Sequence, residues 1–169
     1  MIVTRLAAPS DAGAVAATIS EGFETYRAWA PVDWTPPVVG EGDQQRFADA
    51  LARPDVWFLV AVSDGVVVGH VALSLSTRED PGPPPPGAVF VWQLFVRPAW
   101  HGHGIGTMLK RAAVSEALSR SFSLTRLWTP EGARRARRFY EREGWALTGG
   151  AHRHSDFGLA TVEYGRRIP

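Results

Sequence analysis

The sequence contains no cysteine, a single lysine and no long apolar run, and each absence excludes a class of protein or site. Without cysteine there is no disulfide framework, no thiol nucleophile and no cysteine-ligated metal, which suits a reducing compartment. No stretch approaches the roughly 20 apolar residues that cross a bilayer. The N-terminus, MIVTRLAAPSDAGAV, also lacks the basic-then-apolar pattern of a secretory signal. We therefore expect a cytoplasmic protein with no membrane partner.

The length of 169 residues and the 45% hydrophobic content fit one domain over residues 1–169. The formal net charge of +1 gives the whole chain no strong attraction to nucleic acid. The charge is uneven, because residues 10–50 hold seven acidic and two basic residues, whereas residues 97–142 hold ten basic and three acidic ones. This distribution suits a cationic acceptor and an anionic donor, or it reflects only solvated helix faces.

Hydrophobic periodicity predicts the element order βααβββαβαββ and therefore an α/β (α+β) domain. Ser10 is predicted to cap the first helix, and the proline-rich residues 80–87 predict a polyproline-like surface connection. Predicted strands cover residues 2–6, 56–62, 66–76, 88–96, 124–129, 145–148 and 160–167, and predicted helices cover 11–23, 43–52, 107–120 and 133–143.

The most informative segment is VRPAWHGHGIGTMLKRAA, residues 96–113, in which a strand and a proline lead into a glycine-rich turn and an amphipathic helix. Gly102, Gly104 and Gly106 allow a tight turn with exposed N–H groups, and the start of the helix adds unpaired donors and a positive dipole end. These features predict an anion site, or only a tight turn before a helix. The segment is not a Walker loop, because no Lys-Ser or Lys-Thr pair follows the last glycine. It is not a dinucleotide fingerprint, because its spacing is GxGxG and it lies mid-chain after a hairpin. It is not a kinase loop, because the catalytic Asp and metal-binding motifs are absent.

Two stretches resemble the GNAT (GCN5-related) N-acetyltransferases: LFVRPAWHGHGIG, and ARRARRFYEREGW with its Phe-Tyr-Glu and Gly-aromatic pairs. The element order resembles that family over nearly the whole chain. The resemblance implies a mixed, mostly antiparallel twisted sheet of six to seven strands flanked by about four helices. It also implies acetyl-CoA as co-substrate.

The resemblance assigns roles to individual residues. Tyr140 matches the tyrosine that protonates the leaving thiolate, and Arg137 lies one helical turn earlier, near the phosphates. His101 and Ala133 depart from the family pattern, which usually has Gln or Arg at the first position and often has Asn at the second. The resemblance implies that the pantetheine arm pairs with a bulged strand at Leu94, Phe95 and Val96. It also implies that backbone N–H groups bind the diphosphate, at His101, Gly102, His103, Gly104, Ile105, Gly106 and Thr107.

The acceptor is expected to be the primary amine of a small molecule, or of a peptide. Aromatic residues near acids suit an organic cation, although the same aromatics could belong to a core or a dimer surface. An alkylammonium must lose a proton before it attacks. Candidate acceptor contacts are Phe23, Glu24, Tyr26, Trp29 and Trp34, and candidate routes for the proton are Glu21, Glu24, His152, His154, Glu163 or a chain of water molecules.

Other patterns are weaker. The pairs His101/His103 and His152/His154 lack further ligands at metal spacing, so we expect no metal. The arginines of residues 134–138 fall on different helix faces, so we expect no nucleic-acid partner. Two alternatives to an enzyme remain, a non-catalytic acyl-CoA-binding regulatory module and a nucleic-acid-associated protein, and a homodimer remains open.

Overall fold

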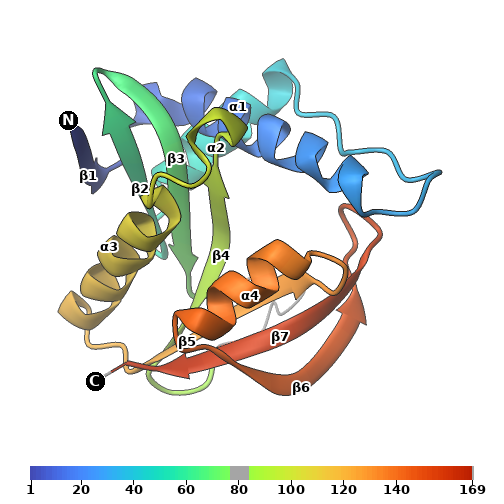
Figure 1. Ribbon diagram of the computed structural model, residues 1–169. Coiled ribbons are helices and arrows are strands. Elements are labelled where there is room, and N and C mark those ends of the chain that lie inside the picture. The colour runs from blue at the N-terminus through green and yellow to red at the C-terminus, as the bar shows by residue number, and fades with distance from the viewer. Residues whose placement is uncertain (77–83, 169) are drawn as a thin grey trace.

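The computed structural model describes residues 1–76 and 84–168, and Figure 1 shows their arrangement. Residues 80–83 of the predicted polyproline-like connection lie outside these ranges. Within the described ranges, no helix is both long and apolar enough to cross a membrane. The strands are β1 (Ile2–Leu6), β2 (Val56–Ser63), β3 (Val66–Ser74), β4 (Ala88–Val96), β5 (Leu124–Pro130), β6 (Ala146–Arg153) and β7 (Ala160–Arg167). The α-helices are α1 (Ala12–Glu24), α2 (Glu41–Leu51), α3 (Ile105–Ser119) and α4 (Arg134–Arg142).

The seven strands form one sheet in the order β1-β2-β3-β4-β5-β7-β6. Every neighbouring pair is antiparallel except β4 and β5, which are parallel and paired only from Ala88 to Phe90 and from Leu124 to Arg126. The predicted fold class, element order and mixed, mostly antiparallel sheet are confirmed. The short parallel ladder joins the two halves of the sheet.

A separate apolar cluster lies on each face of the sheet. Helices α3 and α4 cover one face, where Leu109 and Tyr140 pack with residues of β3, β4 and β7 (Figure 1). Helices α1 and α2 cover the other, where Val15 and Phe47 pack with β2 and β3. Strands β2 and β3 are apolar on both sides because both of their faces are covered, which is why they read as nearly continuous apolar runs.

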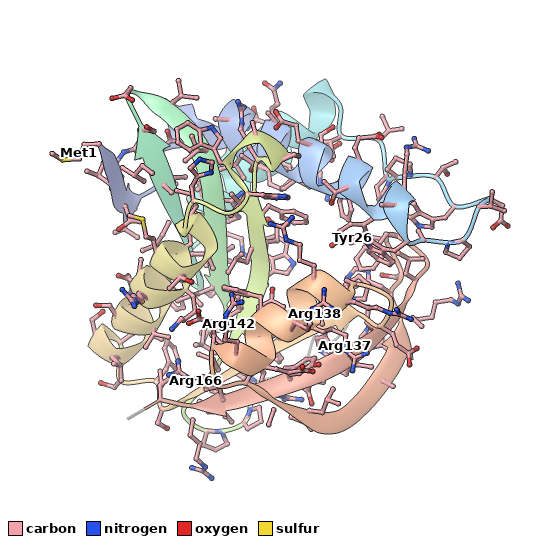
Figure 2. The ribbon with its side chains drawn as sticks, viewed as in Figure 1. Met1, Tyr26, Arg137, Arg138, Arg142 and Arg166 are labelled. Carbon is pink, nitrogen blue, oxygen red and sulfur yellow. The ribbon has the colours of Figure 1, made fainter. Side chains whose placement is uncertain are left out.

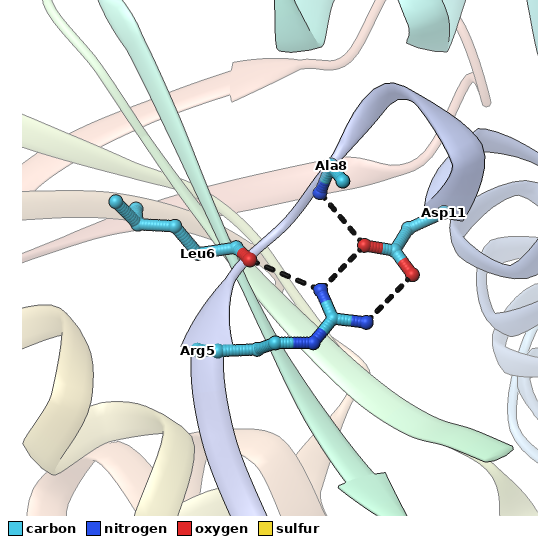
Figure 3. Close-up of polar contacts among 4 residues, drawn as sticks. All are labelled: Arg5, Leu6, Ala8 and Asp11. Carbon is cyan, nitrogen blue, oxygen red and sulfur yellow. Dashed lines mark hydrogen bonds and ion pairs between the residues drawn. The ribbon is translucent and has the colours of Figure 1, made fainter. Parts of the chain in front are cut away.

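The predicted Ser10 cap is wrong, because Asp11 makes the polar contacts at this end of α1. Its carboxylate accepts a hydrogen bond from Ala8 N at 2.7 Å and two from the Arg5 guanidinium, at 2.6 and 2.9 Å (Figure 3). Arg5 also donates to Leu6 O at 3.0 Å, and the hydrogen bonds from Arg5 hold the pKa of Asp11 below its usual value. The charged carboxylate of Asp11 forms stronger hydrogen bonds with the Arg5 guanidinium than the Ser10 hydroxyl could form.

Strand β6 is longer than predicted, since it continues to Arg153 through residues expected to be a loop. Its register with β7 is irregular between Leu147 and Ala151, and Gly149 there has φ +94°. A glycine in the left-handed region interrupts the alternation of side chains that would have indicated one continuous strand.

Candidate functional site

Beyond the short parallel ladder, β4 and β5 separate. Residues Val91–Val96 of β4 keep β3 as their paired strand, while residues 127–130 of β5 pair with β7. The edge of β4 that faces β5 therefore presents backbone groups that no strand pairs. Such an edge can accept an extended ligand as an added strand. Leu94, Phe95 and Val96 are half-exposed along it.

A bulge interrupts β4 beside this edge. Ala72 of β3 pairs with Gln93 and Leu73 pairs with Val91, so Trp92 is an extra residue without a partner on β3. The bulge turns two successive side chains toward the α1 and α2 face, because the Trp92 ring lies 5.9 Å from Phe58 and Gln93 reaches His70. It also rotates the backbone groups around Trp92 out of the regular ladder.

The glycine loop between β4 and α3 exposes backbone donors. Gly102 and Gly104 have φ +85° and +77°, and a Cβ added at either would meet no atom within 4 Å. Among the described residues, the N–H groups of Gly102 and of Gly104–Thr107 have no hydrogen-bond partner. These donors and the positive end of the α3 dipole are the groups that an anion site requires, and anion binding by the loop stays a prediction.

Three predicted members of this loop have different surroundings. The amides of His101 and His103 donate to Pro98 O at 3.1 Å and to Trp100 O at 3.5 Å, so a tight turn uses them. Gly106 is helical, and a Cβ there would lie 3.5 Å from Phe139 of α4. Its small size therefore lets α4 approach closely.

The His101 side chain joins the loop to its two neighbours. Its Nε2 lies 3.0 Å from Val96 O and therefore donates to it, and its Nδ1 accepts from Arg135 Nη1 at 3.0 Å. Burial lowers the pKa of His101, and nearby Arg135 lowers it further. The imidazole is thus held neutral, and the positive charge next to the loop belongs to Arg135.

A partly buried ion pair fixes α3 to α4 behind the loop. Lys110 Nζ lies 2.6 Å from Glu143, and the Thr107 hydroxyl donates to the same carboxylate at 3.0 Å. The hydrogen bond from Lys110 is the main reason that the pKa of Glu143 lies below its usual value.

A cavity of about 370 Å³ opens where β4 and β5 separate. Residues 90–95 of β4 and 127–130 of β5 form its floor, and Ala136 and Tyr140 of α4 reach it from the other side. Tyr140 is 8% exposed, and burial raises its pKa to about 12. Its phenol therefore stays protonated at neutral pH, as a proton donor requires.

An aromatic wall closes the other end of the cavity. Phe23, Tyr26 and Phe157 line it, with ring centroids 5.4 Å apart for Phe23–Tyr26 and 5.8 Å apart for Phe23–Phe157. Figure 2 shows Tyr26 near the N-terminal end of α4. The Trp34 indole donates to Phe157 O at 2.8 Å, which ties the chain after α1 to the β6–β7 connection.

Several predicted site residues do not line this cavity. Trp29 packs behind Tyr26 at 4.7 Å and covers Gly132, and the exposed Glu24 pairs with Arg27 at 2.7 Å. Neither side chain lines the cavity in this structure, and contacts from Trp29 and Glu24 to an acceptor stay predictions.

Two predicted cofactor contacts on α4 are also engaged elsewhere. Arg137 donates to the Tyr164 hydroxyl at 3.0 Å and to Glu131 O at 3.2 Å, so its guanidinium lies on the β7 side of α4 (Figure 2). Ala133 is buried, and its amide donates to Pro130 O at 3.0 Å. A role for either residue in cofactor binding stays a prediction.

Of the five side chains predicted as bases, all of them described, only His154 lines the cavity. Its Nδ1 accepts a hydrogen bond from Asp156 N at 3.1 Å, and its ring stacks on Phe157 at 3.8 Å. Glu21 lies 3.6 Å from Arg97. Glu163 is 5% exposed and pairs with Arg126 and Thr148.

Sequence reasoning did not name many of the lining residues as site residues, among them Gln93, Ala136 and Phe157. Gln93 is a polar residue in a predicted strand, and its side chain reaches His70 and the cavity because of the bulge at Trp92, whose position the sequence does not reveal. Ala136 carries no chemical signal. Phe157 is brought to the cavity by a connection distant in sequence from the first helix.

Comparison with known proteins agrees with this geometry. The profile of the acetyltransferase (GNAT) family matches residues 21–145. The chain is 36% identical over 95 residues to an uncharacterized N-acetyltransferase of Archaeoglobus fulgidus, across 53% of this chain and 60% of that protein. It is 35% identical over 101 residues to an IAA acetyltransferase of Azospirillum brasilense, across 59% of this chain and 60% of that protein. The match thus spans 60% of the length of each of these relatives.

The fold also has solved counterparts. The PaiA N-acetyltransferase of Thermoplasma acidophilum, in complex with coenzyme A, superposes with a TM-score of 0.77 over 99% of both chains, at 14% identity. At that identity the likeness shows the fold alone. The family profile, in contrast, spans well over half of the sequence, so this chain belongs to the acetyltransferase (GNAT) family.

Proposed function

We propose that this protein transfers an acetyl group from acetyl-CoA to a primary amine of a small molecule, by direct attack within a ternary complex. One observation carries the proposal: the unpaired N–H groups of the glycine loop follow, a few residues along the chain, the unpaired edge of β4, and residues 90–95 of β4 line the cavity at Tyr140. The Thermoplasma relative, which holds coenzyme A on the same fold, supports the choice of donor.

The residues present fit a CoA diphosphate and its arm. The donors of Gly102 and Gly104–Thr107 would hold the diphosphate, because the space beside both left-handed glycines is open. Arg135, which donates to His101, supplies positive charge at the loop. His101 does not add to this charge, because its pKa is lowered. The arm would lie along Leu94, Phe95 and Val96.

Acetyl-CoA supplies the acetyl group as a thioester. An N–H of β4 near the Trp92 bulge would donate to the thioester oxygen and stabilise the negative charge that develops there, an effect of about 3 kcal/mol per donor. As the amine nitrogen forms the new C–N bond and the C–S bond breaks, the Tyr140 hydroxyl gives its proton to the sulfur. As the amide forms, its nitrogen releases a second proton to water, and water returns a proton to the Tyr140 oxygen, so the products are the amide and the free thiol of CoA.

The ammonium proton of the acceptor must leave before attack. We assign it to water in the cavity, because the lone pair of His154 Nδ1 already accepts a hydrogen bond and the predicted glutamates lie away from the lining. The aromatic wall of Phe23, Tyr26 and Phe157 would hold the body of the acceptor.

The test combines calorimetric titration with acetyl-CoA and measurement of free thiol release across a panel of amines. Tyr140→Phe should keep acetyl-CoA affinity but lower kcat about a hundredfold, as expected when a general acid is lost. Tyr164→Phe is the matched control, because its hydroxyl bonds Arg137 and Glu141 outside the cavity lining, so kcat should not change. Binding without turnover on any amine would leave only an acyl-CoA-binding module, and absence of binding would refute the proposal.

A further inference from the structure

A chain of polar side chains runs along the face of the sheet that α1 and α2 cover and ends in the cavity. It runs from Thr18 on α1 through His70 on β3 to Gln93 on β4. The Thr18 hydroxyl lies 2.6 Å from His70 Nδ1, and His70 Nε2 lies 3.1 Å from Gln93 Oε1. Thr18 and His70 are both 0% exposed, and the mechanism above uses none of the three.

The packing fixes the plane of the imidazole. Its ring lies between Phe58, at 6.0 Å with an interplanar angle of 29°, and Phe95, at 5.8 Å and 33°. Phe95 in turn lies against Gly22 of α1, where an added Cβ would be 2.1 Å from the ring. His70 therefore has little freedom to rotate away from Gln93.

The direction of the hydrogen bonds follows from the last group in the chain. Because Gln93 Oε1 can only accept, His70 Nε2 carries the proton of the neutral imidazole and donates it. Nδ1 is then an acceptor, and the Thr18 hydroxyl shares its single proton between Nδ1, 2.6 Å away, and Val15 O, to which it donates at 2.8 Å. With its oxygen occupied by His70, the Gln93 amide has a fixed orientation.

The amide nitrogen of Gln93 is left to face the acceptor. Gln93 lines the cavity, and its nitrogen has no hydrogen-bond partner among the described residues. This nitrogen carries two protons and no lone pair that can accept, so it attracts an oxygen and does not attract an ammonium group. Around it the cavity is largely aromatic, with Phe90, Trp92 and Phe95 on the same strand.

We propose that Gln93 donates a hydrogen bond to an oxygen that the acceptor carries next to its amine, and that His70 is the positioning residue that orients Gln93. The inference rests on the proposed function and narrows its substrate class to amines with an aromatic or apolar body and a neighbouring hydroxyl or carbonyl oxygen. An analogue that lacks the oxygen leaves this donor unpaired, so the enzyme should discriminate against it.

The test compares two amines, phenylalaninol and 2-phenylethylamine, which differ by the hydroxymethyl group. The measured quantity is the ratio of their kcat/KM values, which does not depend on the fraction of active protein. The wild type should favour phenylalaninol by about tenfold, the effect of one hydrogen bond. Gln93→Met, which keeps the length of the side chain and removes the donor, should bring the ratio close to one.

His70 is tested by a pair of variants and a control. His70→Leu should lower the ratio as Gln93→Met does, whereas His70→Gln, whose amide N–H can take the place of Nε2–H, should restore it to within about threefold of the wild type. Val60→Ala is the control, because Val60 is the partner of His70 on β2 and its truncation disturbs the packing without removing a polar group. It should lower the melting temperature and leave the ratio unchanged.

The outcomes separate this inference from the proposed function. A protein that binds acetyl-CoA but does not distinguish the two amines, in turnover or in calorimetric binding to the CoA complex, overturns the inference alone. An unchanged ratio in Gln93→Met does the same. A protein without affinity for acetyl-CoA overturns the proposed function, and this inference with it.

Discussion

Mild acid should destabilise the protein through His70. Burial lowers the pKa of this imidazole to about 4, from 6.5 in an exposed histidine. Between these two values the unfolded chain binds a proton that the folded protein does not, so stability is complete above pH 6.5 and is lost as the pH falls toward 4. One pKa unit corresponds to about 1.4 kcal/mol, which gives a total loss of about 3 kcal/mol, of which about 2 kcal/mol is lost by pH 5.

The measurement is urea unfolding of the wild type and of His70→Gln at several pH values between 7.5 and 4.5. Glutamine keeps the hydrogen-bonding groups but does not titrate, so the wild type should lose about 2 kcal/mol more than the variant by pH 5. In a protein of this size that is a difference of roughly 4–8 °C in melting temperature. The carboxylates of Asp11 and Glu143 have lowered pKa values, but they are present in both proteins and cancel in the comparison. Parallel stability curves over this range would refute the assignment of a buried, neutral His70.

Three further substitutions test other parts of the structure. Gly104→Ala places a side chain at φ +77°, so it should cost about 1–2 kcal/mol in urea unfolding and, in calorimetry, weaken acetyl-CoA binding more than Gly40→Ala, which lies outside the loop. Glu143→Gln removes the carboxylate that pairs with Lys110, so it should lower the free energy of unfolding by about 1–2 kcal/mol at pH 7. Because the pKa of Glu143 is lowered, the difference between the two proteins should vanish as the pH falls through the pKa of the folded state. Asp11→Asn should lower the free energy of unfolding by about 1 kcal/mol at pH 7, a modest value because Arg5 is 45% exposed. The free energies of the two proteins should converge once acid protonates Asp11, and a difference that persists at pH 2 would contradict the ion pair as its cause.

The parts of the site that could be predicted from sequence are those in which local pattern and geometry coincide. The glycine loop follows its strand directly, and the spacing of Gly102 and Gly104 requires the left-handed backbone that the structure has. The order of the elements was predictable for the same reason, since each strand or helix carries its own periodicity.

The parts that could not be predicted depend on contacts distant in sequence. Whether Arg137 meets a phosphate or Tyr164 depends on where β7 lies, which helical spacing does not give. Trp29 was expected in the cavity, but Gly132 leaves room for its ring one layer behind. In the sequence His70 is one polar residue within an apolar strand, and its partners in the structure come from α1 and β4.

The two ends of the cavity are built in different ways, and this has an evolutionary consequence. The backbone groups proposed to hold the acetyl donor come from one continuous stretch, β4 through the start of α3. The aromatic wall joins residues after α1 to Phe157, through a hydrogen bond between positions 123 residues apart. Phe157 also lies beyond residue 145, where the family match ends. Mutation of the β6–β7 connection can therefore reshape what the protein accepts while the donor end is inherited unchanged.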